Sequence, residues 1–63
     1  MTFTEKDKEN LKVAMIKKYG RTSMLTLANE LDVSRMAINN AITNKPSFDK
    51  LRERSKEWIK ENK

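Results

Sequence analysis

An all-α domain is the fold class that this sequence predicts, from its composition and its apolar spacing. Charged and hydrophobic residues each make up 37% of the chain, with one Gly and one Pro. This balance suits compact helices better than a sheet or a disordered tail. Apolar residues recur at the 3.6-residue period of amphipathic helices. We expect one domain over residues 1–63, with four or five helices, placed at about 5–18, 23–31, 34–43 and 48–61.

The first helix is expected to begin near Glu5 and to end before Gly20. Thr4 can serve as its N-cap, with Asp7 three residues on as in a capping box. Lys17 and Lys18 in the last turn oppose the negative end of the helix dipole. One face should carry Leu11, Ala14, Met15, Lys18 and Tyr19, whereas Val13 lies off this face and should be partly exposed.

Two short helices joined by a tight turn at Asp32-Val33 are expected between Met24 and Thr43. Ser23 and Ser34 are their expected N-caps. Each helix carries an apolar stripe, formed by Met24, Leu27, Ala28 and Leu31 in the first and by Ile38, Ala41 and Ile42 in the second. This is the pattern of a helix-turn-helix, whose second helix lies in the DNA major groove.

The outer face of the second short helix contains no acidic residue between Ser34 and Thr43. Arg can pair with guanine, Asn with adenine, and an apolar group can pack on the thymine methyl. Asn is a poor helix former, so the adjacent Asn39 and Asn40 favour a functional role over simple solvation. The expected base-contacting residues are Ser34, Arg35, Met36, Asn39, Asn40 and Thr43.

Phosphate contacts are expected at both ends of this helix pair. Hydroxyls and backbone N–H groups at a helix start can receive a phosphate, and basic side chains follow the end of the second helix. The expected phosphate-contacting residues are Arg21, Thr22, Ser23, Asn44, Lys45 and Lys50.

The last helix should begin after Pro46, which interrupts the preceding helix. Ser47 is its expected N-cap. Its apolar face carries Phe48, Leu51, Ser55, Trp58 and Ile59, of which Trp58 and Ile59 complete either the core or a dimer contact. The other face alternates acidic residues with basic ones that we expect to be exposed, namely Lys50, Arg52, Arg54, Lys56 and Lys60.

The composition argues against an enzyme or a metalloprotein. The chain has no Cys and no His, so it lacks thiolates, the commonest metal ligand and the commonest general base. It also lacks a carboxylate pair, a nucleophile–base pair and a phosphate loop. We therefore expect no catalytic residue, no metal site, no cofactor and no small-molecule ligand.

The longest apolar run, residues 13–16, is far shorter than the roughly 20 residues that span a bilayer, and the N-terminus lacks the order of a signal peptide. A cytoplasmic protein without membrane contact is expected. The net charge of +5 and the pI near 9.8 favour a polyanionic partner. The same charge could also simply keep the protein in solution.

The run YGRTSMLTLANELDVSRMAINNAITNK resembles the helix-turn-helix of phage Cro and repressor proteins. AINNAI with the preceding LDVS looks especially like the Cro repressors of lambdoid phages. The resemblance covers about Leu11 to Lys45, a little over half the chain. It implies a lambda-repressor-like domain and a small repressor, located in the host bacterial cytoplasm, that binds palindromic operators as a dimer. It also implies base contacts by the residues matching Ser34, Arg35, Met36, Asn39 and Asn40.

Two departures from that family are present. Asp32 stands in the turn where the family usually has Gly, and a left-handed conformation is less favourable for Asp. After Pro46, a charged helical pattern replaces the strands by which one Cro branch dimerises, so the chain looks like the all-helical branch. Dimerisation through paired strands is therefore not expected.

The sequence thus predicts a sequence-specific double-stranded DNA-binding repressor that acts as a weak homodimer or as a dimer formed on DNA. Two alternatives stay open. One is an antirepressor or modulator that grips another regulator through the same helices. The other is a DNA-bending accessory protein similar to an excisionase.

Overall fold

Four helices and no strand make up the computed structural model, which describes residues 2–63. They are α1 (Glu5–Tyr19), α2 (Met24–Glu30), α3 (Arg35–Ile42) and α4 (Asp49–Asn62). Each boundary lies within one residue of the expected position. The chain is a small compact all-α domain measuring 30 × 22 × 16 Å, which confirms the predicted fold class.

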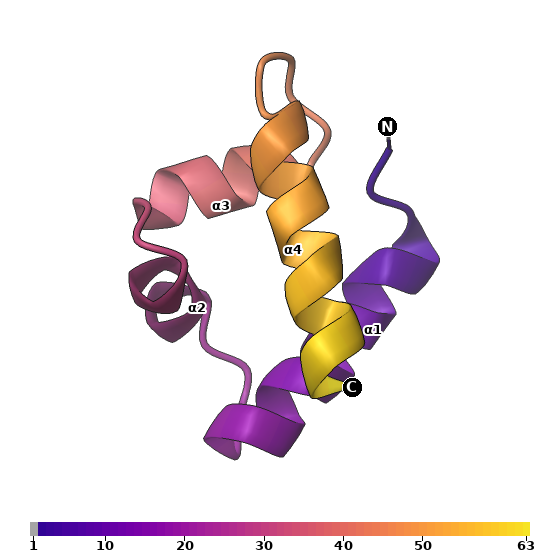
Figure 1. Cartoon of the computed structure of the whole chain (residues 1–63), viewed down its shortest axis with the longest axis vertical. Coiled ribbons are helices and arrows are strands. Elements are labelled where there is room, and N and C mark those ends of the chain that lie inside the picture. The colour runs from indigo at the N-terminus through magenta and orange to yellow at the C-terminus, as the bar shows by residue number, and fades with distance from the viewer. Residues whose placement is uncertain (1) are drawn as a thin grey trace.

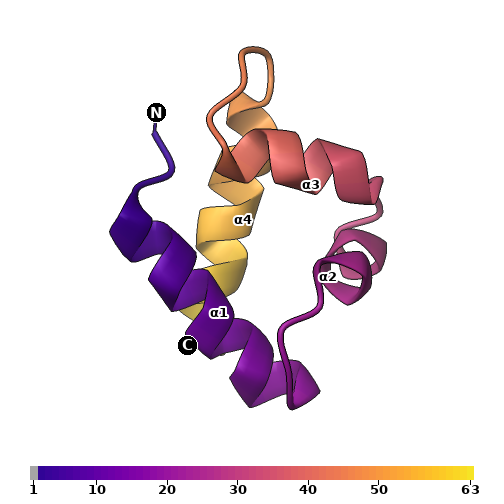
Figure 2. The ribbon, with the colours of Figure 1, turned by 180° about the vertical axis from the view of Figure 1, so that it is seen from behind.

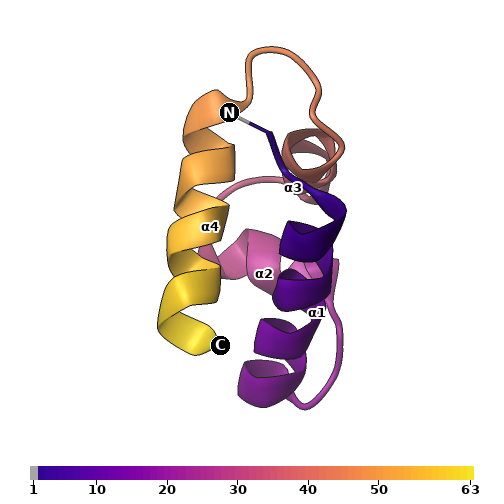
Figure 3. The same cartoon turned by 90° about the vertical axis from the view of Figure 1, so that its right-hand side faces the viewer.

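The long helices α1 and α4 pack against each other, and the short helices lie at one end and side of that pair (Figure 1). α3 packs on both α2 and α4. Seen from behind, α1 lies in front of α4 and α2 is viewed nearly along its axis (Figure 2). In the side view, α4 lies on one side of the molecule, and α1 and α3 lie on the other (Figure 3). None of the helices within residues 2–63 is long and apolar enough to cross a membrane.

The expected caps of the first three helices are present. Thr4 and Asp7 form a reciprocal capping box at α1, with N–H to side-chain distances of 2.9 and 3.1 Å. The N–H of Thr4 is the main reason that the pKa of Asp7 is lowered. The hydroxyls of Ser23 and Ser34 accept the N–H groups of Thr26 and Ala37 at the starts of α2 and α3. Local sequence rules therefore account for these helix starts.

The predicted N-cap of α4 is wrong. Phe48 occupies the cap position and makes no side-chain capping bond. Ser47 has a φ of 73°, which is the left-handed conformation, whereas an N-cap residue in front of a helix is normally extended. The turn after Pro46 thus keeps the Ser47 hydroxyl out of the capping position.

Asp32 adopts the left-handed conformation in the connection between α2 and α3, with a φ of 59°. Its N–H donates to the Asn29 carbonyl at 3.2 Å, and the N–H of Val33 donates to the Ala28 carbonyl at 2.9 Å. These two bonds make a complete Schellman motif, in which Asp fills the position that glycine usually takes. Because Asp tolerates this conformation better than most residues, the turn forms without a glycine.

Within residues 2–63, twelve buried apolar residues form the core, and they come from the four helices, from the C-cap of α2 and from the segment before α1. Trp58 and Ile59 are 4% and 6% exposed, which places both in the core. Val13 is 44% exposed, as predicted. The buried residues are Phe3, Leu11, Ala14, Met15, Leu27, Ala28, Leu31, Ile38, Ala41, Leu51, Trp58 and Ile59.

Phe3 is a core residue that the helical spacing did not indicate, because it precedes the first helix. Its side chain is 1% exposed. Its backbone is held by Asn44, whose side-chain oxygen accepts the Phe3 N–H at 2.6 Å and whose amide donates to the Phe3 carbonyl at 3.0 Å. The N-terminal segment is therefore attached to the end of α3.

Arg52 corrects the expectation that all basic residues of α4 are exposed. It is only 4% exposed, and its guanidinium donates to the carbonyl oxygens of Ala41 and Lys45 at 3.0 and 3.1 Å. It also pairs with Asp49. Backbone carbonyls at a helix C-terminus carry partial negative charge and lack intrahelical partners. The Ala41 carbonyl at the end of α3 and the Lys45 carbonyl in the following loop therefore suit this buried cation, whose Nε has no hydrogen-bond partner.

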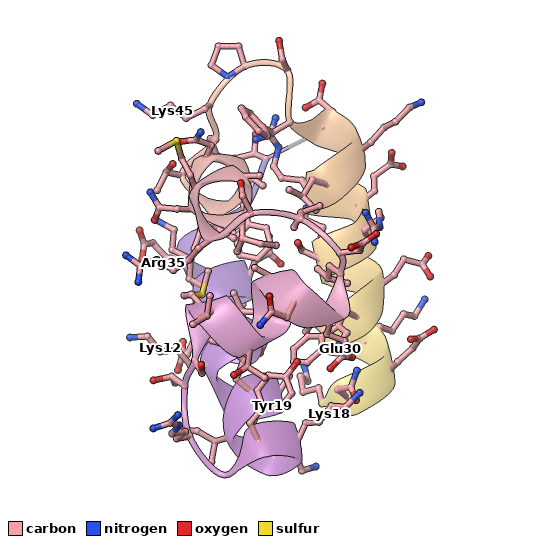
Figure 4. The ribbon with its side chains drawn as sticks, turned by 90° about the vertical axis from the view of Figure 1, so that its left-hand side faces the viewer. Lys12, Lys18, Tyr19, Glu30, Arg35 and Lys45 are labelled. Atoms are coloured by element: carbon pink, nitrogen blue, oxygen red, sulfur yellow. The ribbon has the colours of Figure 1, made fainter. Side chains whose placement is uncertain are left out.

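Glu30 joins three helices at the end of α2. Its carboxylate accepts hydrogen bonds from Lys18 at 2.7 Å, from Tyr19 at 2.6 Å and from the Trp58 indole at 2.6 Å. Figure 4 shows Lys18, Tyr19 and Glu30 gathered beside α2. Above all through the Lys18 bond, these donors lower the pKa of Glu30 to about 2. Burial, followed by the bond to Glu30, raises the pKa of Tyr19. The cluster fixes the end of α2 against α1 and α4.

Candidate nucleic-acid interface

The start of α2 and the outer face of α3 border an open concavity of about 810 Å³. It contains three of the predicted phosphate-contacting residues and three of the predicted base-contacting residues. None of its lining residues is acidic. They are Arg21, Thr22, Ser23, Met24, Leu25, Arg35, Met36 and Asn39.

The first turn of α3 provides the exposed side of this concavity. α3 begins at Arg35, and Ser34 uses its hydroxyl to cap the helix. Arg35 and Asn39 are exposed, and Met36 is 73% exposed. Meanwhile, Ile38 and Ala41 are fully buried beneath them. The helix therefore presents one apolar face to the core and one face with polar residues and the exposed Met36 to solvent, as the spacing predicted.

Three predicted base-contacting residues, Ser34, Asn40 and Thr43, do not line the concavity. Asn40 is only partly exposed. The Thr43 hydroxyl donates to the Asn39 carbonyl at 2.7 Å within α3. Asn40 lies in the second half of α3, and Thr43 is the C-cap residue that follows its last turn. The concavity thus brings together Arg35, Met36 and Asn39, but not the other three predicted base contacts.

The predicted phosphate-contacting residues after α3 do not form one group. The Asn44 amide is already bonded to Phe3. Lys45 is exposed in the loop and points to the same side as Arg35 (Figure 4). Lys50 borders a different surface, together with Val33 and Phe48, on the helix that lies away from Arg35 and Lys45. Lys45 therefore lies on the side of the molecule that carries Arg35, although it does not line the concavity, and Lys50 borders a separate surface.

Lys12 of α1 projects on the same side of the molecule as Arg35 and Lys45 (Figure 4). It is exposed, and within residues 2–63 it forms no ion pair with an acidic side chain. Nothing in its spacing separates Lys12 from the other exposed lysines of α1, so it could not be selected from the sequence. Only the packing angle of α1 brings it to this face.

Comparisons of the chain with protein-family models, with curated proteins and with solved structures give no match. Within residues 2–63, no group of three or more acidic residues could hold a metal ion. What the candidate interface can bind therefore follows from its own chemistry, which consists of exposed cations, hydroxyls, a carboxamide and two exposed apolar side chains.

Proposed function

We propose that α2 and α3 form a helix-turn-helix and that the protein is a sequence-specific regulator that binds double-stranded DNA. The observation that carries this proposal is the concavity in which Arg21, Thr22 and Ser23 lie beside Arg35 and Asn39. Phosphate contacts fix the register of a protein on DNA, and contacts to base edges read the sequence. Both kinds of group occur together here without an acidic neighbour.

In this mechanism, α3 enters the major groove by its first turn. Arg35 can donate two hydrogen bonds to guanine, and Asn39 can exchange two with adenine. Arg21, Thr22 and Ser23 contact the phosphate backbone on one side of α3, and Lys45 contacts it on the other. Lys12 extends the positive surface along α1. Because α3 reaches only a few base pairs, we propose that two copies occupy the half-sites of a palindromic operator.

The proposed consequence of binding is repression, since a protein seated on an operator excludes polymerase by occupying its site. The resemblance to Cro repressors described above supports this role. The end of α3 is supported by Arg52 and the end of α2 by Glu30, so the angle between the two helices is held from outside the interface. Such rigid support favours reading bases over adapting to many partners.

Selection of bound duplexes from a random DNA pool tests the proposal. We expect enrichment of one short sequence, occurring twice with its centres about one helical turn apart. The Arg35→Ala, Asn39→Ala double variant is the matched control, because both side chains are exposed and their loss leaves the core intact. It should enrich no sequence. If the wild-type chain also enriches none, the proposed sequence-specific function is wrong.

The exposed side chains of Leu25 and Met36 favour a second candidate, a module that grips another regulator, because apolar surface on a folded domain can mark a protein contact. The two candidates differ in their response to salt. DNA binding must weaken steeply as salt rises, whereas an interface centred on apolar side chains must not.

A further inference from the structure

Leu25 on α2 and Met36 on α3 are exposed apolar residues that border the same concavity. Their exposed fractions are 57% and 73%. Within residues 2–63, the other large apolar residues that are exposed, Val13 and Ile16, belong to α1 and do not line the concavity. Leu25 and Met36 therefore add little to the core and contribute exposed apolar surface to the lining of the concavity, which we call the Leu25–Met36 pad.

The surroundings of the pad restrict the ligand that fits it. Arg21 and Arg35 supply positive charge and Asn39 a carboxamide within the same concavity. An entirely apolar partner would leave these groups without partners as they lost contact with water, which is unfavourable. The matching ligand presents a small apolar group among hydrogen-bond acceptors and negative charges.

The major-groove edge of thymine has this chemistry. Its C5-methyl group is the apolar feature among the base edges of the groove, and it lies next to the O4 acceptor, with phosphates on either side. Resting on the proposed DNA binding, we infer that the Leu25–Met36 pad contacts the methyl group of one thymine in each half-site. The flexible Met36 side chain adapts to the methyl group, and Leu25 closes the contact from α2.

With Leu25 in the contact, α2 contributes to sequence specificity. Recognition of the thymine methyl group then depends on the angle between α2 and α3. Asn39 lies one turn after Met36 on α3, so the bases read by the two side chains lie close together in one half-site.

Replacing each thymine of the selected duplex, one at a time, by deoxyuracil tests the pad, because this change removes only the methyl group. We expect one position in each half-site at which the wild-type protein loses about fourfold in affinity, the effect of one buried methyl group. Leu25→Ala and Met36→Ala should bind the thymine duplex more weakly and should lose most of this uracil sensitivity. Val13→Ala is the matched control and should keep it.

The outcomes separate the inference from the function on which it rests. Tight DNA binding without a uracil-sensitive position would overturn the pad alone. Uracil sensitivity that persists in both Leu25→Ala and Met36→Ala would assign the methyl contact to other residues and would also overturn it. Absence of salt-dependent DNA binding by the wild-type chain would overturn both proposals. Because Leu25 and Met36 are exposed, circular dichroism should show both variants folded.

Discussion

The guanidinium of Arg52 donates a hydrogen bond to the carbonyl oxygen of Ala41 across 3.0 Å, so that a cation of α4 caps the last turn of α3. The same group bonds the Lys45 carbonyl, which belongs to the loop on the candidate interface. Arg52 thus holds both the end of α3 and the backbone of Lys45. Its burial, at 4% exposure, makes this support part of the core.

Arg52→Met should destabilise the fold by about 1–3 kcal/mol, because it removes a donor from the Ala41 carbonyl in a buried bond and from the Lys45 carbonyl in a partly buried one. Urea denaturation followed by circular dichroism measures this change. Lys60→Met is the control, since Lys60 is exposed on the same helix, and it should shift stability by no more than about 0.5 kcal/mol. Equal midpoints for the two variants would show that the Arg52 bonds contribute nothing to stability.

Glu30→Gln should destabilise the protein at neutral pH and much less in acid. The pKa of Glu30 is lowered from 4.5 to about 2, so the ionised carboxylate stabilises the fold above pH 4.5. That contribution is lost as the pH falls through about 2. Unfolding free energies measured at pH 7 and pH 2 should therefore show a difference between wild type and variant that shrinks toward zero in acid.

The difference in unfolding free energy between the wild type and Glu30→Gln separates the contribution of Glu30 from that of the other carboxylates. Asp7 and Asp49 also have lowered pKa values, so the wild-type stability falls with acid for several reasons at once. Glu53→Gln, an exposed change on α4, should show little difference at either pH. If the effect of Glu30→Gln is as large at pH 2 as at pH 7, its charge is not what stabilises the cluster.

The N-caps of the first three helices and the turn after α2 could be predicted from the sequence, because they depend on neighbouring residues, whereas the N-cap predicted for α4 was wrong. Thr4, Ser23 and Ser34 each accept an N–H group three residues ahead, and Asp32 replaces glycine in a turn whose bonds all lie within a few residues. The buried faces of the helices were predictable in the same way from the spacing of apolar residues. Such features need no knowledge of how the helices pack.

The remaining features depend on the angles at which the helices pack, and the spacing of residues along the sequence does not determine these angles. Arg52 belongs to an alternating charged pattern in the sequence. That pattern does not indicate that its guanidinium reaches the carbonyl oxygens of Ala41 and Lys45. The burial of Phe3 accompanies two hydrogen bonds between its backbone and the side chain of Asn44, which is distant in the sequence. For the same reason, Lys12 could not be separated from other lysines, nor Lys50 placed away from Lys45.

Asn39→Ala should lose about 1–3 kcal/mol of discrimination at one base position, because Asn39 is assigned a two-bond contact with adenine. Affinities for the selected duplex, for its single-base variants and for random DNA measure this loss. Lys45→Ala is the contrast, since a phosphate contact should weaken binding to all of these duplexes nearly alike. Equal losses on selected and random DNA for Asn39→Ala would contradict the assigned contact.

Lys12→Ala should lower the salt dependence of DNA binding, because one phosphate contact fewer releases fewer counterions. The slope of log affinity against log salt should become shallower by about 1. Lys60→Ala removes the same charge from α4 and serves as the control, with an expected slope equal to that of the wild type. Identical slopes for the two variants would remove Lys12 from the proposed interface.

The affinity of the wild-type chain for duplex DNA, measured across a range of salt concentrations, tests the central claim most directly. Phosphate contacts from the cations Lys12, Arg21 and Lys45 should give a slope of log affinity against log salt of about −3 for each bound copy, at about −0.9 per phosphate. The Arg35→Ala, Asn39→Ala double variant should bind more weakly and lose its preference for the selected duplex. A flat salt response, or no binding to DNA at low salt, would contradict the assignment of this surface to nucleic acid.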